Sequence, residues 1–369
     1  MAQREKLKIP KRLVEKYGKN FPIWSFSRIN TLENCSYEYY LNYIKRLDSE
    51  DNIYTACGSC AHDIIQGFYE GKIKREEMAD KFEEDFLDIE ISDYKFSSDD
   101  DKNTKMRNKY KECVIHFFKH HQPIKTKVLT EKPIWIDVDG HVFVGYVDAI
   151  TKDEEGNYYI IDWKTSSIYK GSKVKQHAKQ LLLYALGLHQ AGIPLENIRV
   201  AWNFLKYCNI TYKQKNGKYK TVSAERNKWV SAIKTPLKRD IKDNYKIEDW
   251  EVDLKYEECV KNNSLKTLDK SIQDKYKIGD CYVYADVNEQ DINGLKKELI
   301  EAIELINQRG VDEENWERDE ISQEDEFYCS VLCGQRKNCK YYKVHLEKLG
   351  KKEKEEADII AELDEILPF

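Results

Sequence analysis

The spacing of apolar and polar residues divides the chain into three stretches that favour different secondary structures. Over residues 1–130, apolar and aromatic side chains recur every three or four positions, which is typical of amphipathic helices. Between residues 131 and 225, β-branched and aromatic residues alternate with polar ones, and Asp-Gly and Glu-Gly pairs predict tight turns. Helical spacing returns over residues 226–320. The pattern therefore predicts an α/β protein whose mixed core lies between two helical regions.

Individual elements follow from the same spacing and from the residues that begin or end helices. We expect one helix over 27–47 that is capped by Ser27, a second that starts near Gly58, and further helices over 75–90, 102–120, 173–190 and 290–308. Three antiparallel strands are expected over 132–167, and two further strands over 197–207 and 218–224. Together these elements would form a sheet flanked by helices.

The hairpin expected between residues 145 and 165 brings three charged residues together. Its loop, DEEGN, is centred on Glu155, and a hairpin symmetric about that residue places Asp148 opposite Asp162. Directly opposed side chains on one face lie about 4.5–5.5 Å apart at Cβ. Lys164 shares this face because side chains alternate along a strand, whereas Trp163 points the other way. Two carboxylates and an ammonium group should therefore converge.

This group of charges has a chemical interpretation and a simpler one. Two carboxylates so close repel each other unless a cation lies between them, and oxygen ligands of this kind suit Mg²⁺ or Mn²⁺. Such a metal can polarise a phosphoryl oxygen and activate water, while a nearby lysine orients the water or neutralises developing charge. In the simpler interpretation, Lys164 only offsets the two acids on a surface strand pair. The apolar flanking strands favour a site at the edge of a core.

Charge is distributed unevenly, although the chain as a whole is nearly balanced. The 61 Lys and Arg residues against 66 Asp and Glu give a formal net charge of −5. Residues 164–179 carry five Lys and no acid, residues 206–239 carry ten Lys or Arg against one Glu, and residues 312–326 are almost purely acidic. Local basic segments can follow a phosphate backbone whatever the net charge. The alternative is that these segments are ordinary solvated surface.

Hydropathy argues against membrane and secreted classes. The longest nearly unbroken apolar run, Leu181–Leu188, has 8 residues, which is less than half of a membrane span. The charged N-terminal sequence lacks the apolar segment of a signal peptide. We therefore expect a cytoplasmic protein of a bacterial or virus-infected cell, without a membrane partner.

The ten cysteines of the chain are expected to be thiols, because disulfides are rare in a reducing compartment. Three of them, Cys329, Cys333 and Cys339, form the pattern C-x3-C-x5-C, and this density indicates a metal or cluster site. Cys57 and Cys60 form a C-x-x-C pair without a second such pair to complete a zinc site. We expect these two to pack within the fold.

Four short motifs occur in a fixed order along the chain. They are G-x-x-x-H at Gly58–His62, G-x-x-D at Gly145–Asp148, D-x-K at Asp162–Lys164 and Q-x-x-x-Y at Gln180–Tyr184. Together they resemble the PD-(D/E)XK nuclease superfamily, specifically its RecB-like exonuclease branch. The resemblance implies a restriction-endonuclease-like mixed sheet flanked by helices. It also implies metal ligation by His62, Asp148, Asp162 and the Trp163 carbonyl, catalysis by Lys164, and an active site framed by Gln180 and Tyr184.

The cysteines extend this resemblance. In the same branch, some members join N- and C-terminal helical segments with a 4Fe–4S cluster, whose thiolate ligands would here be Cys35, Cys329, Cys333 and Cys339. Two features depart from the family pattern. Ser36 replaces a proline, and three residues rather than two separate the first two downstream cysteines. Structural zinc on the same four cysteines, or packing thiols without metal, are the alternatives.

The resemblance covers the chain from Ser25 to Cys339. Within the branch, the chain is similar to CRISPR-associated RecB-like exonucleases, the AddB nuclease domain and stand-alone viral relatives. It predicts five regions. They are an N-terminal helical region 1–130 with Cys35 and His62, a nuclease core 131–225, a helical region 226–320, a cysteine segment 321–345 and a charged tail 346–369.

The function implied by the resemblance is metal-dependent DNA hydrolysis by an exonuclease that acts in recombination, repair or replication. Lys170, Lys173 and Lys175 would contact DNA phosphates. The alternative is a DNA-end-binding or scaffold subunit of a helicase–nuclease or replication/recombination assembly, in which cleavage is secondary.

Partners follow from two further features of the sequence. The chain lacks a Walker motif, so any helicase would be a partner rather than part of this chain. The ending AELDEILPF is similar to the C-terminal tips of bacterial single-stranded-DNA-binding proteins, which dock on replication or recombination partners. An ordinary frayed tail is the alternative.

Overall fold

The computed structural model describes residues 8–351 of the 369-residue chain. The described part of the chain divides into two compact units, one formed by residues 8–23 and 56–296 and the other by residues 24–55 and 297–351. The predicted docking tip, residues 361–369, lies outside the described residues. No helix in the described part of the chain is both long enough and apolar enough to cross a bilayer.

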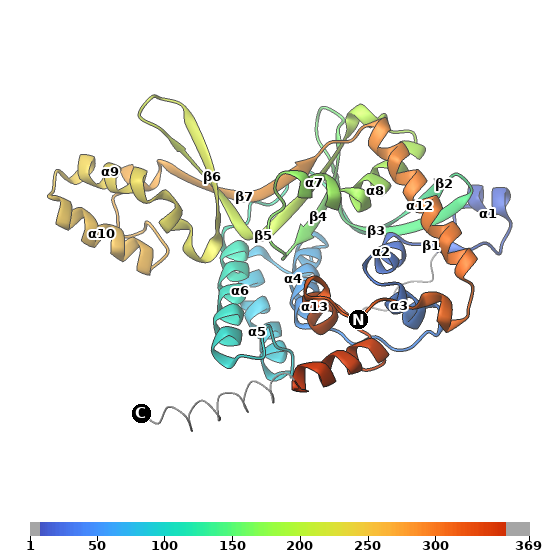
Figure 1. The fold of residues 1–369 in the computed structure, drawn as a ribbon. Coiled ribbons are helices and arrows are strands. Elements are labelled where there is room, and N and C mark those ends of the chain that lie inside the picture. The colour runs from blue at the N-terminus through green and yellow to red at the C-terminus, as the bar shows by residue number, and fades with distance from the viewer. Residues whose placement is uncertain (1–7, 352–369) are drawn as a thin grey trace, which may run out of the picture. The chain divides into compact units, whose positions relative to one another are not determined.

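The first unit is built on a mixed sheet, which has seven strands among the described residues (Figure 1). They are β1 (Ile23–Trp24), β2 (Val128–Val138), β3 (His141–Lys152), β4 (Tyr158–Lys164), β5 (Ile198–Lys213), β6 (Tyr219–Glu225) and β7 (Tyr276–Ala285). Their order is β1-β3-β4-β5-β6, with β2 also paired to β3 and β7 to β5. The pair β4–β5 is parallel, whereas β2–β3–β4 is the antiparallel trio predicted from the sequence.

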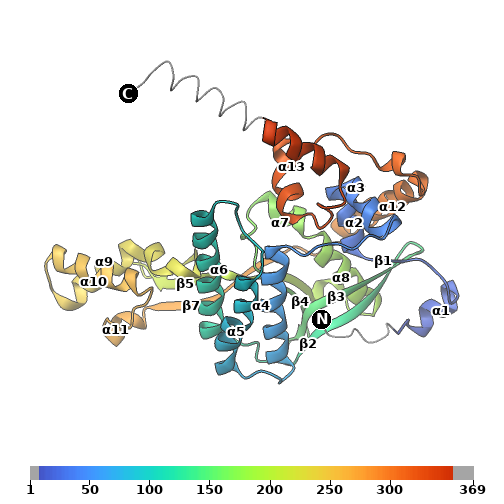
Figure 2. The same ribbon diagram turned by 90° about the horizontal axis from the view of Figure 1, so that it is seen from below.

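Helices flank this sheet, as predicted. They include α4 (Ile53–Tyr69), α5 (Met78–Ile91), α6 (Asp100–His120), α7 (Ser172–His177) and α8 (Lys179–Gln190). The helices α4, α5 and α6 lie side by side in both views (Figures 1 and 2). The apolar run of α8 is buried, and a Cβ at Gly187 would lie 2.2 Å from Ile134, so α8 approaches β2 closely. The single helix expected over 173–190 is interrupted at Ala178, where the chain makes a tighter turn back to Lys175.

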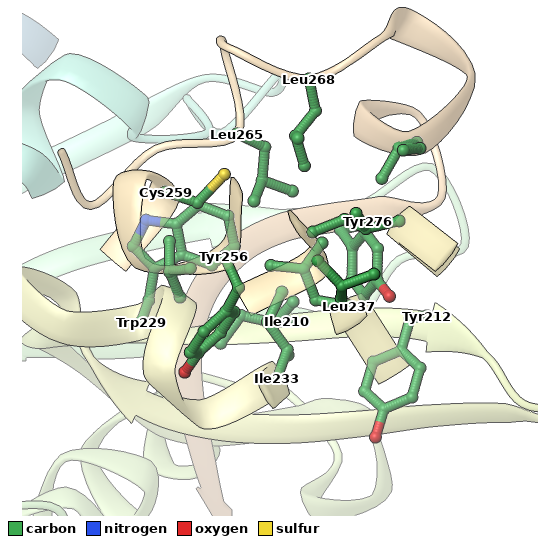
Figure 3. Close-up of a cluster of buried hydrophobic side chains, with 14 of the residues drawn as sticks. Ile210, Tyr212, Trp229, Ile233, Leu237, Tyr256, Cys259, Leu265, Leu268 and Tyr276 are labelled. Atoms are coloured by element: carbon green, nitrogen blue, oxygen red, sulfur yellow. The ribbon is translucent and has the colours of Figure 1, made fainter. Parts of the chain in front are cut away.

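A second hydrophobic core lies in the first unit, in a segment that we call the insertion lobe (residues 208–280). Beyond the end of β4, β5 continues into this lobe with β6, η4 (Arg226–Ile233), α9 (Lys234–Tyr245), α10 (Asp249–Lys261) and α11 (Lys270–Gln273), and β7 returns from it. Its core includes Ile210, Trp229, Leu237, Tyr256 and Tyr276 (Figure 3). The insertion lobe is therefore stabilised by a hydrophobic core of its own.

The strand β7 differs from the prediction, which assigned helices to residues 226–320. It pairs with β5 from Tyr212↔Tyr276 to Val200↔Ala285, with a register shift between Asn203 and Cys208. Its sequence, YKIGDCYVYA, contains the aromatic and β-branched residues that favour strands. The expected helical region therefore contains a strand at residues 276–285 that the sequence did not predict, because pairing with a distant strand determines the structure there.

The second unit joins segments from the two ends of the chain. It contains α2 (Phe26–Asn34), α3 (Ser36–Tyr39), η1 (Tyr40–Ile44), the end of α12 (Glu289–Arg309), η5 (Glu313–Trp316), α13 (Gln323–Phe327) and η6 (Tyr328–Leu332). Hydrogen bonds connect the two segments, including Tyr328 Oη to Glu38 at 2.5 Å and Asn52 Nδ2 to the Leu332 carbonyl at 3.0 Å.

The N-terminal helix of this unit begins and ends differently from the prediction. Ser25, rather than Ser27, caps α2, because its hydroxyl accepts a hydrogen bond from the Arg28 amide at 3.2 Å. Cys35 has extended backbone angles and separates α2 from α3. Its sulfur accepts from the Glu38 amide at 3.4 Å, so Cys35 caps the next helix. The prediction of one continuous helix here is wrong for this reason.

Candidate active site

The register of the β3–β4 hairpin brings the charged residues of the candidate site together. The strands pair Ala149 with Ile161 and Thr151 with Tyr159, which is the register predicted from symmetry about Glu155. The next position along this ladder places Asp148 beside Asp162. At the end of β4, the Trp163 amide donates to Asp148 Oδ2 at 2.9 Å.

Asp162 and Lys164 form a close ion pair on one face of β4. The Lys164 Nζ atom lies 3.0 Å from Asp162 Oδ1 and 2.8 Å from Oδ2. The Asp162 side chain is 7% exposed and that of Lys164 is 30% exposed, so the ion pair is partly shielded from water. Burial opposes the charge of Lys164, but the carboxylates of Asp162 and Asp148 outweigh burial and raise its pKa above the ordinary value. Lys164 is therefore a fixed positive charge.

Asp148 is the more perturbed carboxylate. Burial and the negative charge of Asp162 raise its pKa from 3.8 to about 6, although His62 and Lys164 act in the opposite direction. Its Oδ2 atom lies 3.5 Å from His62 Nδ1, and His62 Nε2 lies 2.6 Å from the Trp163 carbonyl oxygen. The four groups predicted as metal ligands, His62, Asp148, Asp162 and the Trp163 carbonyl, thus come from α4, β3 and β4 to one place.

Gln180 and Tyr184 lie on one side of α8, one turn apart. The Gln180 amide donates to the Tyr184 hydroxyl at 2.9 Å, and burial raises the pKa of Tyr184 to about 12, so this phenol stays protonated. A Cβ at Gly145 would lie 2.2 Å from the Tyr184 ring. The glycine of the G-x-x-D motif is therefore required by the approach of Tyr184 to β3.

The three lysines predicted to contact DNA are exposed around α7. Lys170 and Lys173 point to solvent, whereas Lys175 Nζ lies 2.7 Å from Asp291 Oδ1. A phosphate at Lys175 would have to compete with this carboxylate.

Comparison with known proteins identifies the family. A model of the PD-(D/E)XK nuclease superfamily matches residues 23–340, which is most of the chain and includes every motif residue described above. The chain belongs to the PD-(D/E)XK nuclease superfamily. A search of curated proteins found no match.

Two solved structures resemble this superfamily member at low sequence identity. A "Putative exonuclease" from Eubacterium rectale is 12% identical, covers 66% of this chain and 89% of its own, and gives a TM-score of 0.32. The structure of SSO0001 is 16% identical, covers 53% of this chain and 76% of its own, and gives a TM-score of 0.17. Because both TM-scores are low, the assignment rests on the family match.

The structure also places aromatic residues beside the site that the sequence did not single out. The Tyr69 ring stacks on Trp163 with an interplanar angle of 3°, and its hydroxyl lies 3.2 Å from His121 Nε2. Tyr69 lies two helical turns after His62 on α4, a spacing that could have indicated a shared face. It supports the back of Trp163, whose carbonyl faces His62.

A second aromatic pair lies close to Lys164. The rings of Tyr169 and His177 stack at 4.0 Å, and Tyr169 packs edge-on against Trp202 and Phe204 of β5. Burial lowers the pKa of His177, and the charges of Lys173 and Lys164 lower it further. His177 is therefore neutral at physiological pH, and the pair offers an uncharged aromatic surface.

The donor set suits a divalent cation in its chemistry. Within residues 8–351, no three His, Cys, Asp or Glu side chains are arranged closely enough to hold one metal ion as they stand. However, burial and the negative charge of the neighbouring Asp162 raise the pKa of Asp148, so the two carboxylates repel each other even though Lys164 Nζ lies 2.8 Å from Asp162 Oδ2. A cation between the two carboxylates would offset this repulsion. His62 and the Trp163 carbonyl are close enough to complete the oxygen- and nitrogen-rich set.

The four cysteines of the predicted cluster line one cavity in the second unit, together with Arg318. Arg318 Nη1 lies 3.2 Å from Cys329 Sγ and 3.6 Å from Cys35 Sγ, and the Gln335 amide donates to Cys333 Sγ at 3.4 Å. The sulfurs are not drawn together into a metal-binding group in the described residues. Cys57 and Cys60 belong to the first unit, and burial raises the pKa of both to about 12, so they remain packed thiols.

The raised pKa of Asp148 predicts a pH dependence of metal affinity. Below about pH 6 a proton occupies this carboxylate, and a bound metal would have to displace it. We expect the dissociation constant for Mn²⁺, measured by titration calorimetry, to rise about tenfold per pH unit below 6 and to be flat above 7. The pKa of Asp148 is higher in the folded protein than in the unfolded chain. The free energy of unfolding of the metal-free protein should therefore increase as Asp148 takes up a proton between about pH 6 and pH 4.

The control for this prediction is Asp148→Asn, which cannot bind the proton. Its remaining Mn²⁺ affinity should not follow the same profile between pH 5 and pH 8. A wild-type affinity that is constant over that range would contradict the assignment of Asp148 as a ligand.

Proposed function

We propose that this superfamily member is a metal-dependent DNA nuclease. The observation that carries the proposal is the convergence of Asp148, Asp162 and Lys164 at the end of β4, where one ammonium group contacts a buried carboxylate. Two acids and a lysine in this arrangement match the D-x-K signature of the superfamily, and fixed charges in a partly buried place suit hydrolysis of a phosphodiester.

Each residue has a role in this proposal. Asp148, Asp162, His62 and the Trp163 carbonyl would hold Mg²⁺ or Mn²⁺, which supplies charge stabilisation at the scissile phosphate. Lys164, fixed by Asp162, would donate to the attacking water or to the phosphoryl oxygen. Tyr184 and Gln180 are joined by a hydrogen bond and would position the nucleic-acid backbone beside the active site.

The finer proposal is an exonuclease that acts in DNA recombination, repair or replication. The test is digestion of linear, nicked and covalently closed circular DNA, labelled at either end, with Mg²⁺ and with Mn²⁺. An exonuclease should degrade linear DNA from a labelled end and leave closed circles intact. Cleavage of closed circles would indicate an endonuclease, and an absence of cleavage under all conditions would favour the end-binding or scaffold role.

We also propose that Cys35, Cys329, Cys333 and Cys339 hold a 4Fe–4S cluster. What supports this is a shared cavity lined by four thiols, with Arg318 donating to two of the sulfurs as the donors around cluster thiolates do. The cluster would fasten the N-terminal segment to the C-terminal segment of the second unit.

Replacing any one of these cysteines by alanine should remove the cluster and lower the melting temperature. We expect protein prepared without oxygen to contain iron and sulfide and to absorb visible light, and the variants to lose these signals. The matched control is Cys57→Ala, because Cys57 is buried but does not line this cavity. Zinc without iron in the wild-type protein would contradict the cluster and support structural zinc.

A further inference from the structure

The turn that joins β5 to β6 is an ordered, strongly basic hairpin. We call residues 213–220, with the sequence KQKNGKYK, the lysine hairpin. The Gln214 amide donates to the Lys218 carbonyl at 2.8 Å, and the Lys218 amide donates to Asn216 Oδ1 at 3.0 Å. Gly217 has a φ of +79°, a left-handed angle that glycine adopts without strain. The hairpin therefore has a defined shape.

The four lysines of this hairpin are not neutralised by the described part of the protein. Within residues 8–351, none of them has an Asp or Glu within salt-bridge distance, although most other basic residues of 206–239 are paired. The four hairpin lysines are Lys213, Lys215, Lys218 and Lys220, all of which are exposed, whereas Arg226, Lys228, Lys238 and Arg239 each pair with an acid. No acidic residue occurs between 206 and 224. This concentration of positive charge repels itself unless an anion is bound.

One side of the hairpin forms a pocket with the first turns of α9. Lys215 and Lys220 line it from the hairpin and Arg239 lines it from α9, with polar contributions from Gln214, Asn216 and Thr235. Arg239 is already bonded to Asp240 through Nε and Nη2, which orients its guanidinium group. Three cations thus face one open space.

The composition of the hairpin favours a nucleic acid over an acidic protein. Residues 213–220 contain no aliphatic side chain, whereas the centre of a protein interface is usually apolar. Tyr219 is 72% exposed and pairs with Lys213, so a flat aromatic ring lies among the lysines.

The strand β5 connects this hairpin to the candidate active site. Phe204 of β5 pairs with Lys164 at the end of β4, and β5 then continues to Lys213. At about 3.3 Å per residue, this stretch spans roughly 30 Å. That distance corresponds to roughly nine base pairs of duplex DNA. The core of the insertion lobe supports the far end of β5 through Ile210 and Tyr212 (Figure 3).

We propose that the lysine hairpin binds the phosphate backbone of the DNA substrate, roughly nine base pairs from the scissile phosphate. That this DNA is the substrate rests on the proposed nuclease function, whereas the binding itself requires no cleavage. The insertion lobe then acts as a DNA-binding arm that sets the length of DNA the protein holds.

The test compares the full chain with a variant in which Lys213, Lys215, Lys218 and Lys220 are all changed to Gln. Binding to labelled duplexes of about 6 to about 24 base pairs is measured in EDTA, which prevents cleavage. Wild-type affinity should rise at least about tenfold once the duplex exceeds roughly nine base pairs, and the variant should lack this rise. The plot of log affinity against log salt should be shallower by about 3 to 4 in the variant, since each phosphate contact contributes about 0.9.

The matched control changes four other exposed lysines, Lys105, Lys246, Lys261 and Lys266, to Gln, which alters the net charge equally. A second variant, with the four hairpin lysines changed to Arg, should recover the length dependence and the salt slope. The proposal is overturned if the Gln variant keeps the length dependence and the salt slope, or if the control variant loses them equally. It is also overturned if the Gln variant binds DNA like the wild type and loses only its binding to polyglutamate, a probe for an acidic protein partner.

Cleavage distinguishes this proposal from the proposed function. With Mg²⁺, duplexes shorter than about eight base pairs should be cut equally by the wild type and the Gln variant, because they do not reach the hairpin. If no substrate is cut but the length and salt effects differ as described, then the nuclease function fails and the hairpin proposal stands. If cutting occurs and the hairpin variant binds long duplexes like the wild type, then only the hairpin proposal fails.

Discussion

Asp162→Asn and Asp148→Asn should each reduce cleavage of linear DNA to near the limit of detection, and Mn²⁺ binding should weaken in both. Each substitution keeps the size of the side chain but removes one of the two carboxylates that converge at the end of β4, buried Asp162 or half-buried Asp148. DNA binding should survive or tighten, because one negative charge has left the path of the phosphate. Single-turnover cleavage and Mn²⁺ titration, performed on the same preparations, measure the two effects.

Lys164→Ala should fail in a different way. The carboxylates remain, so Mn²⁺ should still bind, but the ammonium group that contacts Asp162 and stabilises developing charge is gone. A donor of this kind typically contributes about 10²–10³ in rate. We therefore expect the rate at saturating DNA to fall by about that factor while the affinity for Mn²⁺ is retained.

Lys170, Lys173 and Lys175 provide the matched controls for Lys164. Replacing each by alanine should weaken DNA binding in a salt-dependent manner and leave the rate at saturating DNA nearly unchanged. The effect at Lys175 should be the smallest of the three, since its ammonium group is already paired with Asp291. If Lys164→Ala behaves like these variants, the end of β4 is not the catalytic centre.

The site could be predicted from sequence where its geometry is local. The two acids lie on adjacent strands joined by a short turn, so symmetry about Glu155 was enough to give the observed register. Alternation along β4 then separates Lys164, which faces Asp162, from Trp163, which is buried against Tyr69. The position of His62 beside Trp163 required the family motif, because no local rule brings α4 to the end of β4.

Features that depend on contacts between distant segments could not be read from the sequence. The strand β7 forms because its partner β5 extends beyond β4, and the basic segment 206–239 becomes a hairpin and a pocket only when α9 packs beside it. The ion pair between Lys175 and Asp291 likewise joins two segments far apart in the chain. Such pairings are set by the tertiary structure rather than by local spacing.

The largest effect on stability is expected from Asp280→Ala, a residue outside the candidate site. Asp280 Oδ1 accepts from Arg226 Nη2 at 2.7 Å, and Oδ2 lies 2.8 Å from His121 Nδ1. The side chains of Arg226 and His121 are fully buried, and that of Asp280 is 1% exposed. Removing the carboxylate leaves a buried guanidinium group without its counter-charge, which typically costs about 3–5 kcal/mol.

This network also connects the fold to the site. His121 directly follows α6, Asp280 lies on β7 and Arg226 begins η4, so one carboxylate connects three elements at the base of the insertion lobe. His121 Nε2 lies 3.2 Å from the Tyr69 hydroxyl, and Tyr69 stacks on Trp163 beside His62. We therefore expect Asp280→Ala to loosen both the lobe and the support of Trp163.

Urea unfolding at neutral pH measures the decrease in the free energy of unfolding. Asp274→Ala is the control, because Asp274 forms an exposed ion pair. Burial alone would raise the pKa of Asp280, but His121 and Arg226 lower it below its ordinary value. A carboxylate with a lowered pKa stabilises the protein fully above its unfolded pKa of about 4, and this contribution is lost as pH falls through the folded value. The difference between wild type and Asp280→Ala should therefore be constant from pH 5 to 8 and shrink below about pH 4. A loss no larger than that of Asp274→Ala would show that the buried network does not hold β7 in place.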